Sequence, residues 1–514
     1  MSKTIIIIGA GLAGLSAALQ AAENGCNVKL VSSLPSERAQ SVMAEGGINA
    51  ALNTKDENDS PEEHFTDTIK AACGLADPNA VWGMTQAAPE LVHWLLKLGV
   101  KFNMSGYDDV DLRNFGGQKK KRTAFAQSDT GKQIMTAMID AVRRKEASGM
   151  VERFSHHSFL TLRLCDNICC GCVIRDEYSQ ETVELPGDAV IVATGGMHGL
   201  FGNTTGSLSN TGEVTAELFR LGVPLANGEM IQYHPTTVKC GGKRILISEA
   251  ARGEGGRLFA MKDGKQWYFM EEKYPELGNL MPRDITAREI WKVSHESEVF
   301  LDMTEISEEI ISNKLSGLAD DCMTYLHKDI RKEPVSVLPG IHYFMGGILV
   351  DEQHRTPIQN LYAAGECCAQ YHGANRLGGN SLLGALYGGR VAAKSACEQA
   401  DVVDLSCATQ IDFPPASQIS EIKQLNKVMQ ETMGVVRNEN TLLNGIQTVQ
   451  ALTGNLPLLG MAVLKSALAR KESRGAHWRE DYPKSNDDDY LKTTVARFDG
   501  KQIQISFVPV PERR

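Results

Sequence analysis

The chain has 514 residues and carries 53 lysines and arginines against 63 aspartates and glutamates, a formal net charge of −10 at pH 7. Its 42% of hydrophobic and 23% of charged residues are ordinary for a globular protein of about two to four domains, which excludes disorder, collagen and a small disulfide scaffold. The acidic balance argues against a nucleic-acid partner, because such binding needs clustered lysine and arginine. The only Cys-x-x-Cys, at residues 169–172, is interpreted as small buried hydrophobic side chains, and no metal site is predicted.

The chain opens with a predicted strand, a glycine-rich turn and a helix. Thr4–Ile8 is a β-branched run typical of a strand buried in a parallel sheet. Gly9, Gly11 and Gly14 follow it and lead into a helix that stops at Gly25. In this context the spacing predicts a dinucleotide site, with phosphates held by N–H groups at the helix N-terminus.

The end of the second predicted strand does not fit an NAD site. Asn27–Val31 is followed by Ser32 and Ser33, where NAD-binding folds place an acid for the adenosine ribose. Two further apolar runs end in glycine turns, at residues 188–196 and 360–366. Three separated segments around one dinucleotide indicate FAD more than NAD.

Two local signals concern structure alone. Ser60 and Pro61 read as the N-cap and first residue of a helix, with Glu63 completing a capping box. The basic run Lys119–Arg122 is interpreted as a solvated loop.

Seven motifs, taken together, carry a resemblance to one family. They are Gly9–Gly14, Glu45–Ala50, Ser248–Gly256, Pro282–Asp284, His342–Gly347, His372–Leu382 and Glu472–His477. In this order they resemble the flavoprotein subunits of succinate dehydrogenase and fumarate reductase, a family that also contains L-aspartate oxidase. The resemblance implies an α/β fold with a Rossmann-like FAD-binding domain at residues 1–233 and 343–410. An α+β capping domain at residues 234–342 would interrupt it, and a C-terminal helical domain would span residues 411–514.

The resemblance implies an FAD-dependent oxidoreductase that interconverts fumarate and succinate by hydride transfer at flavin N5 and favours fumarate reduction. Such a reaction needs clamps on both carboxylates of a C4 dicarboxylate and a proton donor on the face opposite the flavin. The implied substrate-binding residues are His234, Ser248, His342, Arg376 and Phe115. The implied catalytic residues are Arg283, which donates and accepts the proton, and its relay residues Glu249 and Arg252.

The cofactor implied by the resemblance is FAD. A helix beginning at Asn380 would direct its positive N-terminus at the flavin N1/O2 edge. Glu213 stands where the family commonly has aspartate. The implied cofactor-binding residues are Gly9, Gly11, Gly14, Ser32, Gln40, Ser41, Glu45, Gly46, Gly47, Thr194, Gly195, Glu213, Glu366, Ser381 and Leu382.

Two other functions remain open. L-aspartate oxidase belongs to the same family, although the loop Asn114–Gly117 resembles the fumarate reductase version. A non-catalytic or tRNA-modifying FAD protein would not need the arginines and histidines of the substrate site, and the charge of −10 does not suit tRNA. We expect electrons to come from an iron–sulfur partner subunit or a soluble carrier. No membrane span is expected in the chain, which we expect in the cytoplasm, with attachment to the cytoplasmic face of a membrane through partner subunits left open.

Gln40 generates a prediction about how FAD is attached. It stands seven residues before Gly47, where many respiratory members of the family carry the histidine that bonds to the flavin 8α carbon. Glutamine cannot form that bond, so FAD is expected to be bound non-covalently. Acid precipitation is then expected to release all of the yellow flavin into the supernatant. Flavin fluorescence that stays with the band on a denaturing gel would contradict this. L-aspartate oxidase also lacks the histidine, so Gln40 does not separate the two activities.

Overall fold

A five-stranded parallel sheet forms the centre of the protein, in a computed structural model that describes residues 2–106, 109–401, 411, 413 and 418–514. The order of its strands is β20-β10-β1-β2-β6. Their bounds are β1 (Thr4–Ile8), β2 (Asn27–Ser32), β6 (Val151–Ser155), β10 (Ala189–Val192) and β20 (Leu361–Ala363). Because every neighbouring pair is parallel, the carboxyl ends of all five strands meet at one edge.

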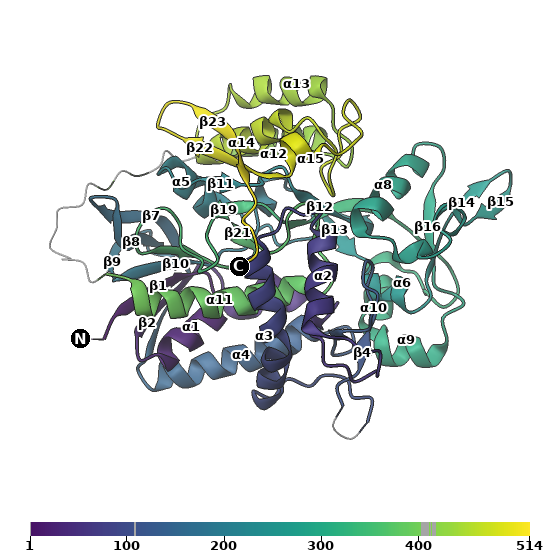
Figure 1. Ribbon diagram of the computed structural model, residues 1–514, viewed down its shortest axis with the longest axis horizontal. Helices are drawn as coiled ribbons and strands as arrows, with labels where there is room; N and C mark the ends of the chain where they lie inside the picture. Colours follow the sequence, from purple (N-terminus) through teal and green to yellow (C-terminus); the bar gives the residue numbers. More distant parts are fainter. Residues whose placement is uncertain (1, 107–108, 402–410, 412, 414–417) are drawn as a thin grey trace.

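The apolar run of β1 is buried on both faces, and its alternate residues belong to two different cores. Ile5 and Ile7 pack with α1 (Leu12–Glu23), α3 (Pro78–Lys97), α4 (Thr130–Ala147) and α11 (Asn380–Gln399), which lie on one side of the sheet in Figure 1. Ile6 and Ile8 pack on the other side with the meander of β7 (His157–Cys165), β8 (Ile168–Asp176) and β9 (Thr182–Pro186). The period of two in a strand explains this division.

The cysteines of the Cys-x-x-Cys run lie in β8. Cys169, Cys170 and Cys172 are fully buried, and Cys169 and Cys172 belong to the core between the meander and the sheet. Among the described residues no group of three histidine, cysteine or acidic side chains could hold a metal ion.

A second part of the molecule, at the right of Figure 1, has its own apolar core. It contains α6 (Glu249–Gly253), α8 (Arg283–Val293), α9 (Glu308–Lys314) and a sheet of order β15-β14-β16-β17, whose bounds are Lys265–Trp267, Arg257–Lys262, Val299–Asp302 and Val335–Ser336. The antiparallel strands β12 (Ile231–Cys240) and β18 (Leu338–Phe344) connect it to the rest, with β13 (Lys243–Leu246) beside β12. The predicted boundaries at 233/234 and 342/343 fall inside β12 and β18, so the two parts share continuous strands. The exact division stays a prediction.

The C-terminal part contains strands as well as the expected helices. α12 (Ile419–Thr432), α13 (Glu439–Val449) and α14 (Asn455–Ala469) pack together at the top of Figure 1. They are followed by β22 (Lys492–Phe498) and β23 (Ile503–Pro509). β22 pairs with β11 (Leu225–Ala226), so the end of the chain is joined by hydrogen bonds to the FAD-binding part. Residues 402–410, at the predicted boundary of this domain, lie outside the described residues.

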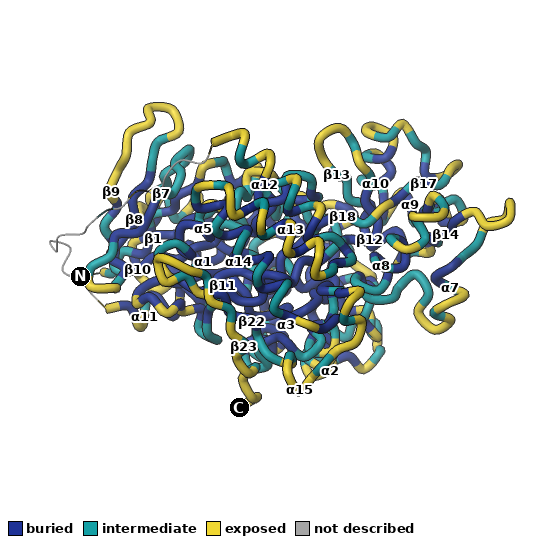
Figure 2. The backbone as a smooth tube through the Cα atoms, turned by 90° about the horizontal axis from the view of Figure 1, so that it is seen from above, coloured by how far each residue is buried: buried dark blue, intermediate teal, exposed yellow. Residues whose placement is uncertain are grey.

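Buried chain, dark blue in Figure 2, runs through the centre, and most of the exposed chain is in loops at the periphery. No helix among the described residues combines the length and the apolar character needed to cross a membrane.

The helix start predicted at Ser60 is confirmed, but the interpretation of Lys119–Arg122 as a solvated loop is wrong for its last residue. α2 (Pro61–Ala71) begins after Ser60, whose Oγ accepts a hydrogen bond of 3.2 Å from the N–H of Glu63. Arg122 is fully buried, because its Nη2 lies 2.8 Å from Asp59 and its Nη1 lies 2.9 Å from Asp67 on α2. Two carboxylates therefore hold one guanidinium inside the protein.

This buried cluster of Arg122, Asp59 and Asp67 gives a stability prediction. Arg122→Ala is expected to lower the free energy of unfolding by about 3–5 kcal/mol, because two buried carboxylates lose their cation. Urea unfolding of the apoprotein, followed by circular dichroism, measures the change. The matched control is Arg143→Ala, whose ion pair with Glu37 is 2.5 Å long but has both side chains at least half exposed, and which is expected to cost less than about 1 kcal/mol. Equal urea midpoints for the two variants would contradict the prediction.

Candidate active site

One cavity of about 1300 Å³ lies at the carboxyl edge of the parallel sheet and extends to the cap-like second part. The carboxyl ends of four strands line it, with Gly9 after β1, Ser32 at the end of β2, Thr194 after β10 and Glu366 after β20. Every cofactor, substrate and catalytic residue predicted from the sequence lines this cavity except Gly14 and Arg252. The structure therefore brings together residues that are up to about 370 positions apart in the chain.

The glycine turn after β1 has room for a phosphate group. A Cβ on Gly9 would lie 2.2 Å from the carbonyl oxygen of Ala193, and one on Gly14 would lie 1.8 Å from that of Gly9. A Cβ on Gly11 would meet nothing closer than 3.7 Å, so no neighbouring protein atom requires glycine there. The side-chain space at Gly11 lies beside the cavity and is available to a ligand, which fits a dinucleotide pyrophosphate at the N-terminus of α1. Gly14 serves the packing of helix on strand instead.

The N-terminus of α11 also opens into the cavity, through Ser381 and Leu382. Buried polar groups behind it hold the first residue of the helix, Asn380. Its Oδ1 accepts a hydrogen bond of 2.7 Å from Asn49 and lies 2.9 Å from Nε2 of His64. Burial lowers the pKa of His64 to about 3, so the imidazole is neutral. Asn49 and His64 were not among the residues predicted from the sequence.

Gln40 and Ser41 lie in the short helix η2 (Gln40–Met43), and both line the cavity next to the glycine turn. The Oγ of Ser41 accepts a hydrogen bond of 3.3 Å from the N–H of Leu12, the first residue of α1. Glu45, Gly46 and Gly47 follow in the same segment. Burial, and then the carboxylate of Asp321, raise the pKa of Glu45 to about 8, so its carboxyl group is mostly uncharged at neutral pH.

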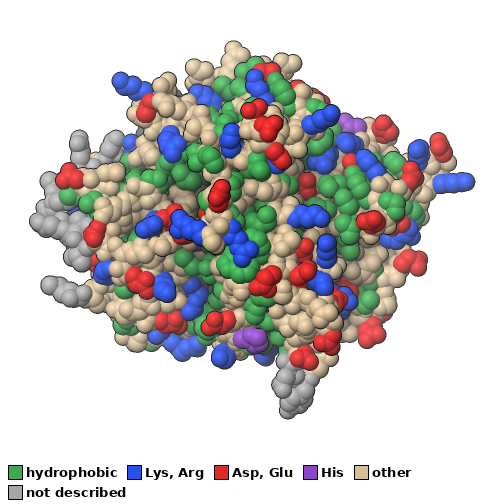
Figure 3. All heavy atoms as spheres, in the orientation of Figure 1, with side chains coloured by type: hydrophobic (Ala, Val, Ile, Leu, Met, Phe, Trp, Pro, Cys, Tyr) green, Lys and Arg blue, Asp and Glu red, His purple; other side chains and the backbone are tan. Residues whose placement is uncertain are grey.

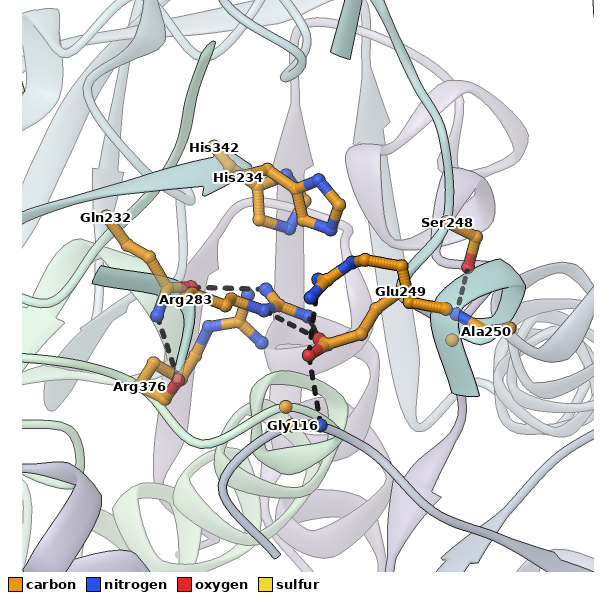
Figure 4. A network of polar contacts seen from close by, with 12 residues as sticks. Gly116, Gln232, His234, Ser248, Glu249, Ala250, Arg283, His342 and Arg376 are labelled. Carbon is orange, nitrogen blue, oxygen red and sulfur yellow. Dashed lines mark hydrogen bonds and ion pairs between the residues drawn. The ribbon is translucent and has the colours of Figure 1, made fainter. Parts of the chain in front are cut away.

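A buried ion-pair network lies at the junction of the two parts (Figure 4). The Nη2 of Arg283, the first residue of α8, is 2.5 Å from Oε2 of Glu249, and Nη2 of Arg252 is 3.5 Å from Oε1. The backbone N–H of Gly116 donates a hydrogen bond of 3.0 Å to Oε1. Burial acts to raise the pKa of Glu249, but the guanidinium groups of Arg283 and Arg252 hold it below its ordinary value. Glu249 is therefore an anion between two cations.

Two neutral histidines lie beside this network. The rings of His234 on β12 and His342 on β18 have centroids 5.1 Å apart, and they lie close to Arg283 in Figure 4. Burial and the charge of Arg283 lower the pKa of both well below the ordinary value. They can therefore donate or accept hydrogen bonds without adding charge.

Arg376 is a buried cation with donor capacity to spare. Its Cζ lies 4.2 Å from the ring centroid of Tyr343, and its Nε has no hydrogen-bond partner among the described residues. Burial, followed by Arg283, lowers the pKa of Arg376 to about 9, so it remains charged at neutral pH. Arg252 and Arg283 share the carboxylate of Glu249, and Arg376 has no ion-pair partner among the described residues, so this end of the cavity is suited to an anion.

Ser248 and Phe115 complete the set predicted for the substrate. Ser248 is the N-cap of α6, where its Oγ accepts a hydrogen bond of 3.4 Å from the N–H of Ala250. Phe115 is buried, and a Cβ on Gly46 or on Gly378 would come within 3.1 Å of its side chain. Phe115 therefore forms a closely packed part of the cavity wall.

Sequence reasoning missed Gln232, which joins the two parts of the site. It is fully buried on β12, accepts a hydrogen bond of 3.2 Å from Nη1 of Arg283, and donates bonds of 2.8 Å to Oδ1 of Asn375 and to the carbonyl of Arg376. Asn375 in turn donates a bond of 3.1 Å to Asp284. Gln232 is two residues before His234, and Asn375 directly precedes Arg376. Their position beside predicted site residues is the sequence feature that could have identified them.

Comparison with known proteins identifies the family. Residues 4–382 match the family model described as FAD binding domain, and residues 452–513 match the model described as fumarate reductase flavoprotein C-term. The succinate dehydrogenase flavoprotein subunit of Bacillus subtilis is 38% identical, over 100% of this chain and 98% of the relative. The 8-methylmenaquinol:fumarate reductase flavoprotein subunit of Wolinella succinogenes is 32% identical, over 100% and 92%.

Solved structures agree. A mutant of the quinol fumarate reductase of Escherichia coli has a TM-score of 0.89 at 27% identity, over 99% of this chain and 97% of that one. Sdh1 of Mycobacterium smegmatis in complex with UQ1 has a TM-score of 0.84 at 29% identity, over 100% and 95%. The predicted fold class and the FAD cofactor are confirmed. The chain belongs to the family of succinate dehydrogenase and fumarate reductase flavoproteins and is an FAD-dependent oxidoreductase that acts on CH–CH bonds.

Proposed function

We propose that the protein interconverts fumarate and succinate and acts in the direction of fumarate reduction. The observation that carries the proposal is the set of buried arginines at one end of the cavity, in which Arg283 is paired with Glu249 while Nε of Arg376 has no partner among the described residues. A dicarboxylate supplies the two negative charges that such a site requires. The predicted absence of a covalent flavin bond at Gln40 supports the direction, because a histidyl bond raises the flavin potential.

Both ends of the substrate have donors in reach. Arg376 and His342 would hold one carboxylate, with the guanidinium supplying charge and two N–H groups in a fixed fork. His234 and the hydroxyl of Ser248 would hold the other. Since both histidines are neutral, the charge of the substrate is balanced by arginine alone. Phe115 keeps water away from the reacting carbons, which strengthens these contacts.

Arg283 would deliver the proton. FAD, when bound and reduced, would supply a hydride from N5 to one carbon of the double bond. Arg283 would give a proton to the other carbon, on which negative charge develops. A guanidinium is a weak acid, so it needs a strongly basic acceptor and a base that returns its proton. Glu249, 2.5 Å away, is placed to return it. Arg252, whose Nη2 is 3.5 Å from Oε1 of Glu249, would be the next member of the relay.

The charge of the site favours fumarate and succinate over the alternatives. L-aspartate carries an ammonium group besides its two carboxylates, so it compensates less of the positive charge of the arginines than a dianion does. An RNA partner is disfavoured by the surface, because lysines and arginines on the face in Figure 3 are interspersed with acidic side chains and do not form a stripe.

We also propose an electron-transfer partner. Relatives are named as flavoprotein subunits, which supports an iron–sulfur partner subunit, with a soluble electron carrier as the alternative. A cytoplasmic location, held to a membrane only through such partners, is part of the same proposal.

The holoenzyme is expected to oxidise reduced viologen with fumarate under anaerobic conditions and to leave L-aspartate unchanged.

Arg376→Ala is expected to lower fumarate turnover by at least about 10²-fold, because a buried donor to the transition state is lost. FAD content should stay normal, since the glycine turns hold the cofactor. Arg257→Ala, which removes a half-exposed ion pair with Glu271, is the control and should keep full turnover. Wild-type turnover by Arg376→Ala at saturating fumarate would exclude Arg376 as a substrate ligand, and oxidation of L-aspartate would favour the oxidase.

Arg283→Lys tests the proton donor separately from cofactor binding. Lysine keeps the charge but has a shorter reach and no fork. FAD content and flavin reduction by an artificial donor should be normal, whereas stopped-flow reoxidation by fumarate should be severely slowed. Arg288→Lys, in the same helix but stacked over Trp478, is the matched control and should react normally. Reoxidation of Arg283→Lys at the wild-type rate would mean that another residue is the acid.

A further inference from the structure

The cavity has a second end, beside the carboxyl end of β2, where the sequence lacks the acid expected for an adenosine ribose. Ser32, the last residue of β2, is 8% exposed, lines the cavity, and has an Oγ without a hydrogen-bond partner among the described residues. We expect this buried hydroxyl to form a hydrogen bond with a bound ligand, because a buried hydroxyl without a partner costs free energy.

An acid reaches this end from another part of the chain. Ser32 pairs with Ser155 of β6, and the next residue, His156, lines the cavity. The carbonyl of His156 accepts a hydrogen bond of 2.8 Å from the N–H of Glu177, in the turn between β8 and β9. Glu177 therefore lies in the cavity wall at the end of β6, the strand that pairs with β2 at Ser32, although it is 145 positions from Ser32 in the chain (177 minus 32).

The carboxylate of Glu177 is held in place although its turn is exposed. The Oγ of Ser158 on β7 donates a hydrogen bond to Oε1 of Glu177. The turn itself is fixed by Asp176, whose Oδ1 accepts bonds of 2.7 Å from the N–H of Tyr178 and 2.9 Å from that of Ser179. An acceptor fixed in this way loses little conformational entropy when it binds a ligand.

Two aromatic rings border the same end. Tyr178 is 78% exposed, the largest exposed fraction among the large hydrophobic side chains described, and it lines the cavity. Its ring centroid is 5.1 Å from that of His156, with an angle of 53° between the planes, so the rings are not stacked on each other. His156 has a φ of +59°, a conformation unusual for a residue other than glycine. A flat base could pack against these rings.

We propose that the turn after β8 forms the adenosine subsite of FAD. Glu177 accepts hydrogen bonds from the ribose hydroxyls, the role that an acid at the end of β2 has in NAD-binding folds. Tyr178, together with His156, covers the adenine. The proposal rests on the FAD cofactor of the family and not on the dicarboxylate reaction, so its test does not involve fumarate.

Glu177→Ala is compared with wild type by titrating apoprotein with FAD and with an FAD analogue whose adenosine ribose lacks both hydroxyls, following flavin fluorescence. Wild type should bind the analogue at least about tenfold more weakly than FAD, since hydrogen bonds to a charged group are lost. Glu177→Ala should bind FAD about tenfold more weakly than wild type and should show little further loss with the analogue. Glu181→Ala, which removes an exposed acid from the same turn, should behave as wild type.

Tyr178→Ala should weaken FAD and the analogue alike, by at least about fivefold, while Tyr178→Phe keeps the ring and should bind normally. A wild-type Kd for FAD in Glu177→Ala, or a full analogue penalty in that variant, would overturn the role of Glu177. If circular dichroism shows that Glu177→Ala does not fold, Glu177→Gln takes its place, because glutamine keeps the size of the side chain and loses its charge. The Kd of Glu177→Gln for FAD is expected to lie between those of wild type and a full loss of the contact. A Kd equal to that of wild type would overturn the proposal.

Discussion

The close approach of α1 to β1 and to α11 is the constraint on which the rest of the site depends. A Cβ on Gly14 would lie 1.8 Å from the carbonyl oxygen of Gly9, and one on Gly389 would lie 2.3 Å from that of Ala13. Without side chains at these positions, two helices pack directly against the strand and each other. Their N-termini then open into the same cavity, at Gly11 and at Ser381. Two partial positive charges therefore face one cavity, and the predicted arrangement of FAD uses the first for phosphate and the second for the flavin.

Burial decides which side chains are charged at the end of the cavity where the substrate is proposed to bind. Arg252, Arg283 and Arg376 are all at most 7% exposed, and among the residues that the structure describes only Glu249 forms an ion pair with any of them. The histidines and Glu45 carry little charge at neutral pH, because burial opposes their ionised forms. The surplus of positive charge is costly in the ligand-free protein and is relieved by a dianion. This free-energy cost is the physical reason for proposing a dicarboxylate as the substrate.

The site is assembled from two parts of the molecule that share strands. Glu249 and Arg283 belong to the cap-like part, while Arg376 follows β20 in the FAD-binding part. Gln232, on the shared strand β12, bonds to Arg283 and to the carbonyl of Arg376. Arg283 and Arg376 therefore cannot move far apart without breaking hydrogen bonds to the side-chain amide of Gln232. Because this amide is fully buried, breaking those bonds would leave its polar atoms unpaired, which costs free energy.

Local signals in the sequence were enough to predict the cofactor, the family and a set of residues that line the cavity. Their signals are local: glycines at fixed spacing after a β-branched run, and short motifs in a characteristic order, such as Pro282–Asp284. It also indicated the helix start at Ser60, because a cap depends on residues within one turn.

The contacts between distant segments are visible only in the folded protein. Arg122 is buried because α2 places Asp67 beside it, although its basic neighbours suggested solvent. The pairing of β2 with β6 brings Glu177 toward Ser32, and the end of the chain returns as β22 to pair with β11. Such contacts leave no periodic trace in the sequence, because they depend on strand order and on close packing between elements, and not on the spacing of neighbours along the chain.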